Sequence, residues 1–131
     1  MKILQINKFF YRRGGADIHF LDLGRLLESH GHEVIHFSAV DSRNEPSPYS
    51  KYFIPSIDLR ARHGLLGGLK VAGHILYSTI AARKLEQLIK DTKPDIAHLH
   101  NIYHHLSPSI LPVLKKYKIP VVMTLHDYKM I

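Results

Sequence analysis

The chain has 131 residues, of which 45% are hydrophobic and 22% are charged, and it contains no Cys. These values predict one globular domain over residues 1–131 and exclude a disordered or collagen-like chain. The lack of Cys excludes disulfides, thiolate zinc sites and Cys nucleophiles. No apolar run approaches the ~18–20 residues of a membrane span, and the first run stops at Asn7, too early for a signal peptide. We therefore expect a soluble, cytoplasmic protein.

The net charge is positive and concentrated in one region. Eighteen Lys and Arg against 11 Asp and Glu give +7, and the eight basic and three acidic residues of 46–93 account for +5 of it. Such a surface attracts nucleic acid, anionic lipid head groups or phosphorylated small molecules. No nucleic-acid-binding motif accompanies the charge, and aromatic residues are not interleaved with it. The sequence predicts no nucleic-acid partner and leaves peripheral contact with an anionic membrane open.

The first third of the chain has the pattern of a βαβ unit. Residues 2–6 form an apolar run rich in β formers, which predicts a buried strand. Residues 8–15 are a loop that ends in two glycines. Apolar positions recur at helical spacing from Ala16, and Gly31 suits the C-terminal end of that helix. A second strand is predicted over residues 34–37, which completes the unit.

The rest of the chain continues to alternate between strand and helix patterns. Residues 41–64 are turn-rich, with three prolines and no clear period. Segments with apolar runs or helical spacing follow them. The predicted elements are a short strand over 51–54, a helix over 65–90, a strand over 95–99, a helix that opens at Ser107-Pro108, and a buried strand over 121–125.

This alternation predicts an α/β fold with a Rossmann-like, doubly wound parallel sheet. Right-handed crossovers favour five strands in the order 3-2-1-4-5, with helices on both faces. Ligands of such sheets bind beyond the carboxyl ends of the strands, where the strand order reverses. We therefore expect three segments to meet there, namely residues 7–17, 100–106 and 126–131.

The glycine pair after the first strand is a candidate phosphate or sugar contact. Gly14 and Gly15 would let backbone N–H groups approach a ligand, and the following helix N-terminus favours an anion. Arg13 beside them also favours an anionic ligand. The pair is not the G-x-G-x-x-G fingerprint of dinucleotide binding, and an ordinary turn between strand and helix is the alternative.

Four histidines between residues 98 and 105 form a polar cluster after the fourth predicted strand. His98 and His100 point to the same side of a strand, no carboxylate lies beside them, and the spacing matches no strong zinc pattern. We therefore predict no metal site. His100 and Asn101 are predicted to hydrogen-bond a ligand, whereas His98 as a satisfied core residue is the alternative.

His126, Asp127 and Tyr128 follow the last predicted strand. A His at the rim of the crevice can act as an acid, a base or a hydrogen-bonding group toward a hydroxyl. Asp127 and Tyr128 would add polar contacts with the substrate. A polar strand end without a function is the alternative.

Five stretches of the sequence stand in a characteristic order along the chain. They are residues 1–6, Gly14-Gly15-Ala16-Asp17, residues 26–34, residues 94–101 and residues 120–128. Together they resemble the N-terminal domain of family 4 glycosyltransferases, whereas residues 41–64 carry little resemblance.

The resemblance implies a two-domain GT-B fold with a cleft between Rossmann-like halves. The N-terminal half would bind mainly the acceptor and the other half the nucleotide-sugar donor, and transfer would retain the anomeric configuration without a metal or other cofactor. It also implies that Gly14-Gly15 contacts the donor diphosphate or the acceptor, and that His126 lies near the transferred sugar as a catalytic residue. A role for Asp17 is not implied, because the family often has Glu or another polar residue there.

The sequence ends at Ile131, before the donor-binding half that the resemblance implies. We therefore expect the acceptor-side domain of a hexosyltransferase-like enzyme, inactive as this fragment, with a sugar or lipid-linked acceptor. A non-catalytic anion- or nucleotide-binding module is the alternative. The last predicted strand would leave a sheet edge through which two copies could pair.

Overall fold

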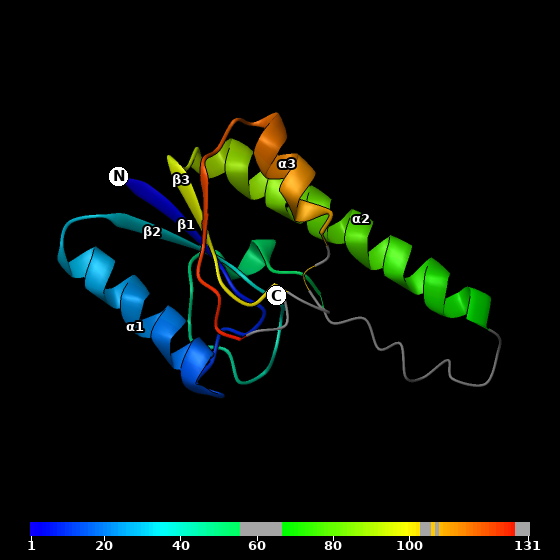
Figure 1. Ribbon diagram of the computed structural model, residues 1–131, viewed down its shortest axis with the longest axis horizontal. Coiled ribbons are helices and arrows are strands. Elements are labelled where there is room, and N and C mark those ends of the chain that lie inside the picture. The colour runs from blue at the N-terminus through cyan, green and yellow to red at the C-terminus, as the bar shows by residue number, and fades with distance from the viewer. Residues whose placement is uncertain (56–66, 103–105, 107, 128–131) are drawn as a thin grey trace.

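The computed structural model describes residues 1–55, 67–102, 106 and 108–127. It contains the predicted α/β architecture, with strands and helices in alternation (Figure 1). The elements in chain order are β1 (Lys2–Ile6), α1 (Gly15–Ser29), β2 (Glu33–Phe37), the 3-10 helix η1 (Ser50–Tyr52), α2 (Gly67–Thr92), β3 (Ile96–Leu99), α3 (Ile110–Lys116) and β4 (Val121–Met123).

The four strands form one parallel sheet in the order β2-β1-β3-β4. Helix α1 lies on one side of this sheet, and α2 and α3 lie on the other (Figure 1). Helix α1 begins at the Gly14-Gly15 turn, with Gly14 as its N-cap. It is followed by Gly31, whose φ of 86° suits glycine after a helix C-terminus. Strand β2 lies on one side of β1, and β3 and β4 lie on the other, so the direction in which strands are added reverses between β1 and β3. Ligands of such folds bind at the carboxyl ends of the strands at this point of reversal.

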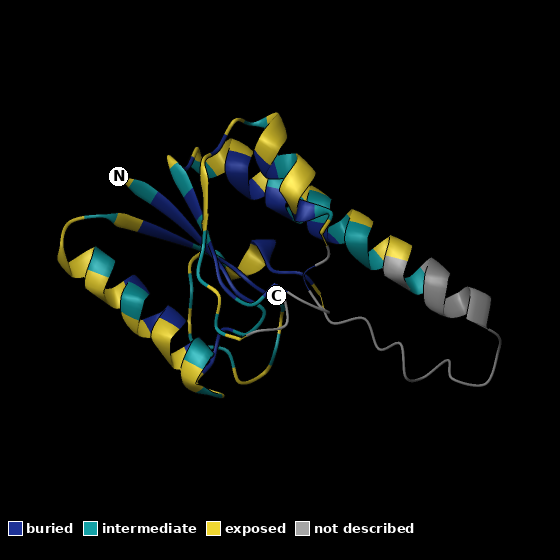
Figure 2. Cartoon of the chain, in the orientation of Figure 1, coloured by how far each residue is buried: buried dark blue, intermediate teal, exposed yellow. Residues whose placement is uncertain are grey.

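The main core lies between the sheet and the α2–α3 side. Leu4 and Ile6 of β1 are fully buried there against Leu85 and Leu88 of α2 and Leu114 of α3. Buried residues are concentrated in the sheet and on the sheet-facing side of these helices (Figure 2). Because side chains alternate along a strand, the residues between these positions point to the α1 side.

The α1 side of the sheet carries a row of polar residues. Gln5 of β1 is in register with His36 of β2 and with His98 of β3. Gln5 is fully buried, and its side-chain atoms have no hydrogen-bond partner within the described part of the chain. Gly24 of α1 lies over this row, and a Cβ there would come within 2.9 Å of Gln5 Oε1 and 3.0 Å of His36 Nε2. The lack of a side chain at Gly24 therefore allows α1 to pack on the sheet.

The prediction of a fifth strand over residues 51–54, and hence of the order 3-2-1-4-5, is wrong. Tyr52 N and Phe53 N donate backward to Tyr49 O and Ser50 O, which forms η1 instead. Only Ile54 reaches the sheet, through a single parallel bridge to Ala39. A strand cannot form because the local 3-10 bonds occupy the N–H groups that a ladder would need.

The last two elements are shorter than predicted. Helix α3 begins at Ile110, with Ser109 at its N-cap, rather than at Ser107-Pro108, and Ser107 lies outside the described residues. Pro112 is tolerated because N–H groups of the first helical turn have no intrahelical acceptor. Strand β4 ends at Met123 and is exposed rather than buried, since Val122 is 50% accessible at the edge of the sheet. Among the described helices, none combines the length and hydropathy needed to cross a membrane.

Candidate functional site

Asn7 connects three segments at the carboxyl edge of the sheet. It follows β1 and is fully buried. Its Nδ2 donates to Asp17 Oδ1 at 2.9 Å, which reaches the first turn of α1. Its Oδ1 accepts a hydrogen bond from Asn101 N at 3.1 Å, which reaches the segment after β3. The predicted meeting of the segments after β1 and β3 is therefore confirmed, and its centre is a residue to which we assigned no role.

Four histidines, His19, His98, His100 and His126, form the second part of the site, and we call them the histidine cluster. His100 Nδ1 lies 3.1 Å from His126 Nε2, and the two ring planes are nearly parallel, with an angle of 19° between them. His98 lies 4.2 Å from His100 between ring centroids and is fixed by a 2.7 Å bond to Thr124 Oγ1. His19 of α1 is 5.4 Å from the His126 ring. The segment after β4 thus joins the other two, as predicted.

Burial and mutual proximity favour the neutral form of three of these rings, His98, His100 and His126. Burial, together with the neighbouring His98, His126 and His19, lowers the pKa of His100 to about 3. Burial and the proximity of His19 lower the pKa of His126 as well, while Asp17 and Asp127 oppose that shift. A neutral imidazole offers one N–H donor and one bare nitrogen acceptor. His98, His100 and His126 can therefore each donate or accept a hydrogen bond at neutral pH.

The glycine pair occupies the N-terminus of α1. Gly14 is the N-cap in an extended conformation, with no side chain to cap the helix, and Gly15 is the first helical residue. A Cβ at Gly15 would meet no described atom within 4 Å. Packing within the described chain therefore gives no reason for glycine at position 15, and the exposed N–H groups of this turn remain accessible to an anion.

Three further site residues were predicted, Arg13, Asp127 and Tyr128. Arg13 is exposed, and its guanidinium carbon lies 4.4 Å from the centroid of the Phe9 ring. Asp127 is exposed next to His126, and its charge acts on the pKa of that ring. Tyr128 lies outside the described residues. The structure thus brings together His100, Asn101 and His126.

Sequence reasoning missed two residues of this site, Asn7 and His19. Asn7 is the first polar residue after an apolar strand, so its position at the carboxyl edge could have been inferred. His19 follows Gly15 by one helical turn and therefore remains near the N-terminus of α1. Within the described part of the chain, no group of three or more His, Asp or Glu residues is arranged to hold a metal ion.

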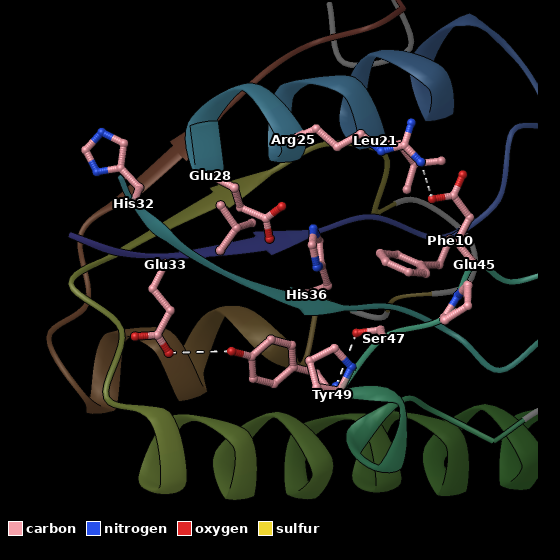
Figure 3. A pocket seen from close by; sticks show the side chains of 13 residues that line it. Phe10, Leu21, Arg25, Glu28, His32, Glu33, His36, Glu45, Ser47 and Tyr49 are labelled. Carbon is pink, nitrogen blue, oxygen red and sulfur yellow. Dashed lines mark hydrogen bonds and ion pairs between the residues drawn. The ribbon is translucent and has the colours of Figure 1, made fainter. Parts of the chain in front are cut away.

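A separate hollow of about 400 Å³ lies between α1, β2 and the segment 45–49 (Figure 3). His36 projects into it from β2, beside Phe10. Arg25 of α1 and Glu45 form an ion pair at 2.8 Å across one end. Burial lowers the pKa of His36 to about 4, so this ring is neutral. None of the histidine cluster lines this hollow, which distinguishes it from the candidate site.

A parallel α/β domain of this topology has a Rossmann-like fold, and its polar, histidine-rich residues lie at the carboxyl edge of the sheet. The chain belongs to Glycosyltransferase Family 4, whose sequence pattern matches residues 13–129. It is 31% identical over 147 aligned residues to an uncharacterized 42.6 kDa protein in the cps region of Klebsiella pneumoniae. That alignment covers the whole chain and 38% of the relative, so the chain spans about two fifths of the relative's length.

Solved structures of distant proteins have the same fold. Two crystal structures of the C-terminal domain of a hydrogenase from Pyrococcus furiosus superpose with TM-scores of 0.62 and 0.60. The alignments cover 95% and 94% of this chain and 90% of each of those chains, at 14% and 13% identity. At such low identity the likeness concerns the fold alone.

Proposed function

We propose that this chain is the acceptor-side domain of a retaining glycosyltransferase that uses a nucleotide-sugar donor. The observation that carries the proposal is the position of His126, which stands at the carboxyl edge of the sheet in a chain of Glycosyltransferase Family 4. In the transfer, the bond between the anomeric carbon and the donor diphosphate breaks and a bond to an acceptor oxygen forms. The proton of the acceptor hydroxyl ends on the released diphosphate or in solvent, so the atoms and charges balance.

His126 would interact with the transferred sugar or the reacting hydroxyl. Its ring is partly exposed, and its Nδ1 has no hydrogen-bond partner within the described part of the chain. Its lowered pKa supports a neutral ring at physiological pH, which can accept a proton or donate a hydrogen bond. We place His126 as the catalytic residue, and the adjacent charge of Asp127 opposes part of the fall in its pKa.

The glycine pair would contact a phosphate of the donor or of the acceptor. The uncapped N-terminus of α1 and the open space at Gly15 favour the close approach of an anionic group. Asn101 is held by Asn7 at the same edge and would contribute a polar contact to the substrate. The basic region 46–93 supports a phosphate-bearing or membrane-bound acceptor, such as a lipid-linked sugar.

We further propose that turnover requires a second domain that holds the donor. The matched relative is more than twice as long as this chain, and a cleft between two halves would bring the donor diphosphate opposite His126. Preorganised groups around the departing diphosphate supply much of the rate enhancement in such reactions. The 131 residues alone are therefore expected to give no turnover.

Gly15 offers a test that separates binding from folding. Gly15→Leu should leave stability unchanged, because leucine is a good helix former and no described atom lies within 4 Å of the new Cβ. Its side chain should nevertheless block an approaching phosphate. In the complete gene product, release of nucleotide diphosphate from a panel of nucleotide-sugars should fall sharply in Gly15→Leu and less in Gly15→Ala. Equal release by both variants and the unmodified protein would argue against a phosphate contact at this turn.

The class of reaction is tested by its products. NMR of the product formed from the active donor should show the same anomeric configuration as in the donor. An inverted product would contradict the proposed retaining transfer. Nucleotide binding without any sugar transfer, for every donor and acceptor tried, would favour a non-catalytic binding module.

A further inference from the structure

His100 is a buried polar residue that is held on all sides. Its side chain is 1% exposed, and its backbone N donates to Ile6 O at 2.9 Å. Phe20 of α1 meets its ring edge to face at 5.2 Å, and the ring of His98 lies 4.2 Å away on β3. Such a ring has few alternative rotamers, because its neighbours fill the space around it. It can therefore fix the orientation of whatever it hydrogen-bonds.

The hydrogen bond between His100 and His126 needs one donor and one acceptor. Both rings are neutral at physiological pH, so each carries a single N–H. Either His100 Nδ1–H donates to a bare His126 Nε2, or His126 Nε2–H donates to a bare His100 Nδ1. In the first arrangement His100 Nε2 is bare and His126 Nδ1 carries a proton. In the second arrangement His100 Nε2 carries a proton and His126 Nδ1 is bare.

The burial of His100 Nε2 favours the first arrangement. This nitrogen is buried and has no hydrogen-bond partner within the described part of the chain. If His126 were the donor, His100 would carry its own proton on Nε2, and a buried N–H would have no acceptor. Buried N–H groups without an acceptor are rarer in proteins than buried acceptors without a donor. His100 therefore carries its proton on Nδ1.

We propose that His100 is a positioning residue that donates its Nδ1–H to His126 Nε2 and so holds His126 as the Nδ1–H tautomer. The ring of His126 then presents an N–H donor to the ligand. This inference rests on the proposed function only for the identity of that ligand, a hydroxyl or phosphate oxygen of a sugar substrate. The tautomer itself is a property of the unliganded chain.

Other groups around His126 affect its charge but do not replace this bond. Asp17 and His19 face it from α1, and Asp127 is its neighbour in sequence. The carboxylates favour the protonated ring and His19 opposes it, so they influence its pKa. Asp17 Oδ1 already accepts the hydrogen bond from Asn7 Nδ2. Within the described residues, His100 is the only group that hydrogen-bonds the His126 ring.

Two isosteric substitutions separate the nitrogens of His100. Asparagine places its amide N–H where Nδ1 lies, whereas glutamine places it where Nε2 lies. In ¹⁵N NMR of the 131-residue chain, His126 should carry its proton on Nδ1, and His100→Asn should preserve this state. His100→Gln should shift His126 toward a mixture of tautomers. A His126 that is protonated on Nε2 in the unmodified chain, or one unaffected by His100→Gln, would overturn the proposal.

A second variant protects the test against misfolding at the buried position. His126 is partly exposed, so His126→Ala should fold, and it removes the acceptor of His100 Nδ1–H. The ¹⁵N shifts of His100 should then change more than those of His98, which bonds to Thr124. Unchanged ¹⁵N shifts of His100 would contradict a hydrogen bond between His100 and His126.

Activity provides a readout that a purely structural role would not alter. In the complete gene product, His100→Gln should lower kcat by about 10²-fold with little change in KM, and should displace the pH profile assigned to His126. His100→Asn should restore most of kcat. An equal loss in both variants would overturn the positioning role. If His126 carried its proton on Nδ1 but the gene product transferred no sugar, the hydrogen bond from His100 to His126 would be supported. The proposed function would be contradicted.

Discussion

Asn7 Nδ2 donates to Asp17 Oδ1 over 2.9 Å, which ties the end of β1 to the first turn of α1. Both side chains are buried, Asn7 completely and Asp17 to 6% exposure. The same Asn7 amide accepts the backbone N–H of Asn101 through its oxygen. One side chain therefore sets the spacing between the glycine turn and the histidine-bearing segment that follows β3.

Asn7→Ala should destabilise the chain by about 1–3 kcal/mol, because it leaves the buried Asp17 carboxylate and the N–H of Asn101 without their partner. Urea denaturation measures the loss. Asp17→Asn is the matched control, since its amide oxygen can still accept from Asn7, and it should lose less. Equal stability of the two variants would show that the hydrogen bond between Asn7 and Asp17 does not stabilise the chain.

Gly24→Ala should destabilise the fold although alanine is the better helix former. The new Cβ would come within 2.9 Å of Gln5 Oε1 and 3.0 Å of His36 Nε2, and Phe10 and Phe20 pack against the His36 ring. Strain of about 1–3 kcal/mol then exceeds the ~1 kcal/mol gained in helix propensity. Gly15→Ala on the same helix meets no described atom and should be neutral or stabilising. Thermal or urea unfolding that shows Gly24→Ala gaining as much as Gly15→Ala would refute the contact.

Stability should fall as the pH drops below about 6.5. Burial lowers the pKa of His36 to about 4 and that of His100 to about 3 from an ordinary value of 6.5, so between these values the unfolded chain binds more protons than the folded one. Each histidine then removes up to about 1.4 kcal/mol per pH unit as the pH falls. Their stabilisation is complete above pH 6.5 and is lost progressively toward pH 4 and pH 3.

Urea unfolding at a series of pH values checks this dependence. Glu86, with a pKa lowered to about 2 from 4.5, contributes mainly below pH 4.5, so the range from pH 6.5 to 5 reports on the histidines. His36→Leu should reduce the slope in that range while the contribution of His100 remains. A slope that is unchanged in His36→Leu would show that His36 is not the titrating group.

The exposed edge of the sheet predicts self-association. Val121 and Val122 are 45% and 50% accessible on β4, which lies at one end of the strand order. We propose that two copies pair through this edge, because an exposed apolar strand offers free ladder groups. Val122→Lys should abolish the dimer in sedimentation velocity experiments. The circular dichroism spectrum should keep the helix signal of the unmodified chain. A monomer at every concentration of the unmodified chain would contradict the pairing.

The elements that the sequence predicts well are those with local determinants. The apolar run of β1 predicts residues 2–6, which is its observed extent, and α1 begins at Gly15, one residue before the first position of its helical pattern. The absence of a strand over 51–54 could not be predicted. It depends on two 3-10 hydrogen bonds, in which Tyr52 N donates to Tyr49 O and Phe53 N donates to Ser50 O. The exposure of β4 depends on its place at the sheet edge, which its apolar sequence does not reveal.

The candidate site shows the same division. The convergence of His100, Asn101 and His126 follows from parallel strands, whose carboxyl ends meet at one edge. The approach of His19 depends on the rotation of α1 over the sheet, which Gly24 permits through a tertiary contact. Arg13 was expected at the site because it precedes the glycines in sequence, and its guanidinium packs on the Phe9 ring. The parallel strand order therefore predicts which residues share the carboxyl edge, whereas the direction of the Arg13 side chain depends on a ring contact that the sequence does not reveal.

The central claim is that His126 is a catalytic residue in sugar transfer, and kcat of the complete gene product with its active nucleotide-sugar tests it most directly. His126→Gln should lower kcat by about 10²-fold or more while nucleotide-sugar binding and the cooperative unfolding transition are preserved. A His126→Gln enzyme with the kcat of the unmodified protein would contradict the account.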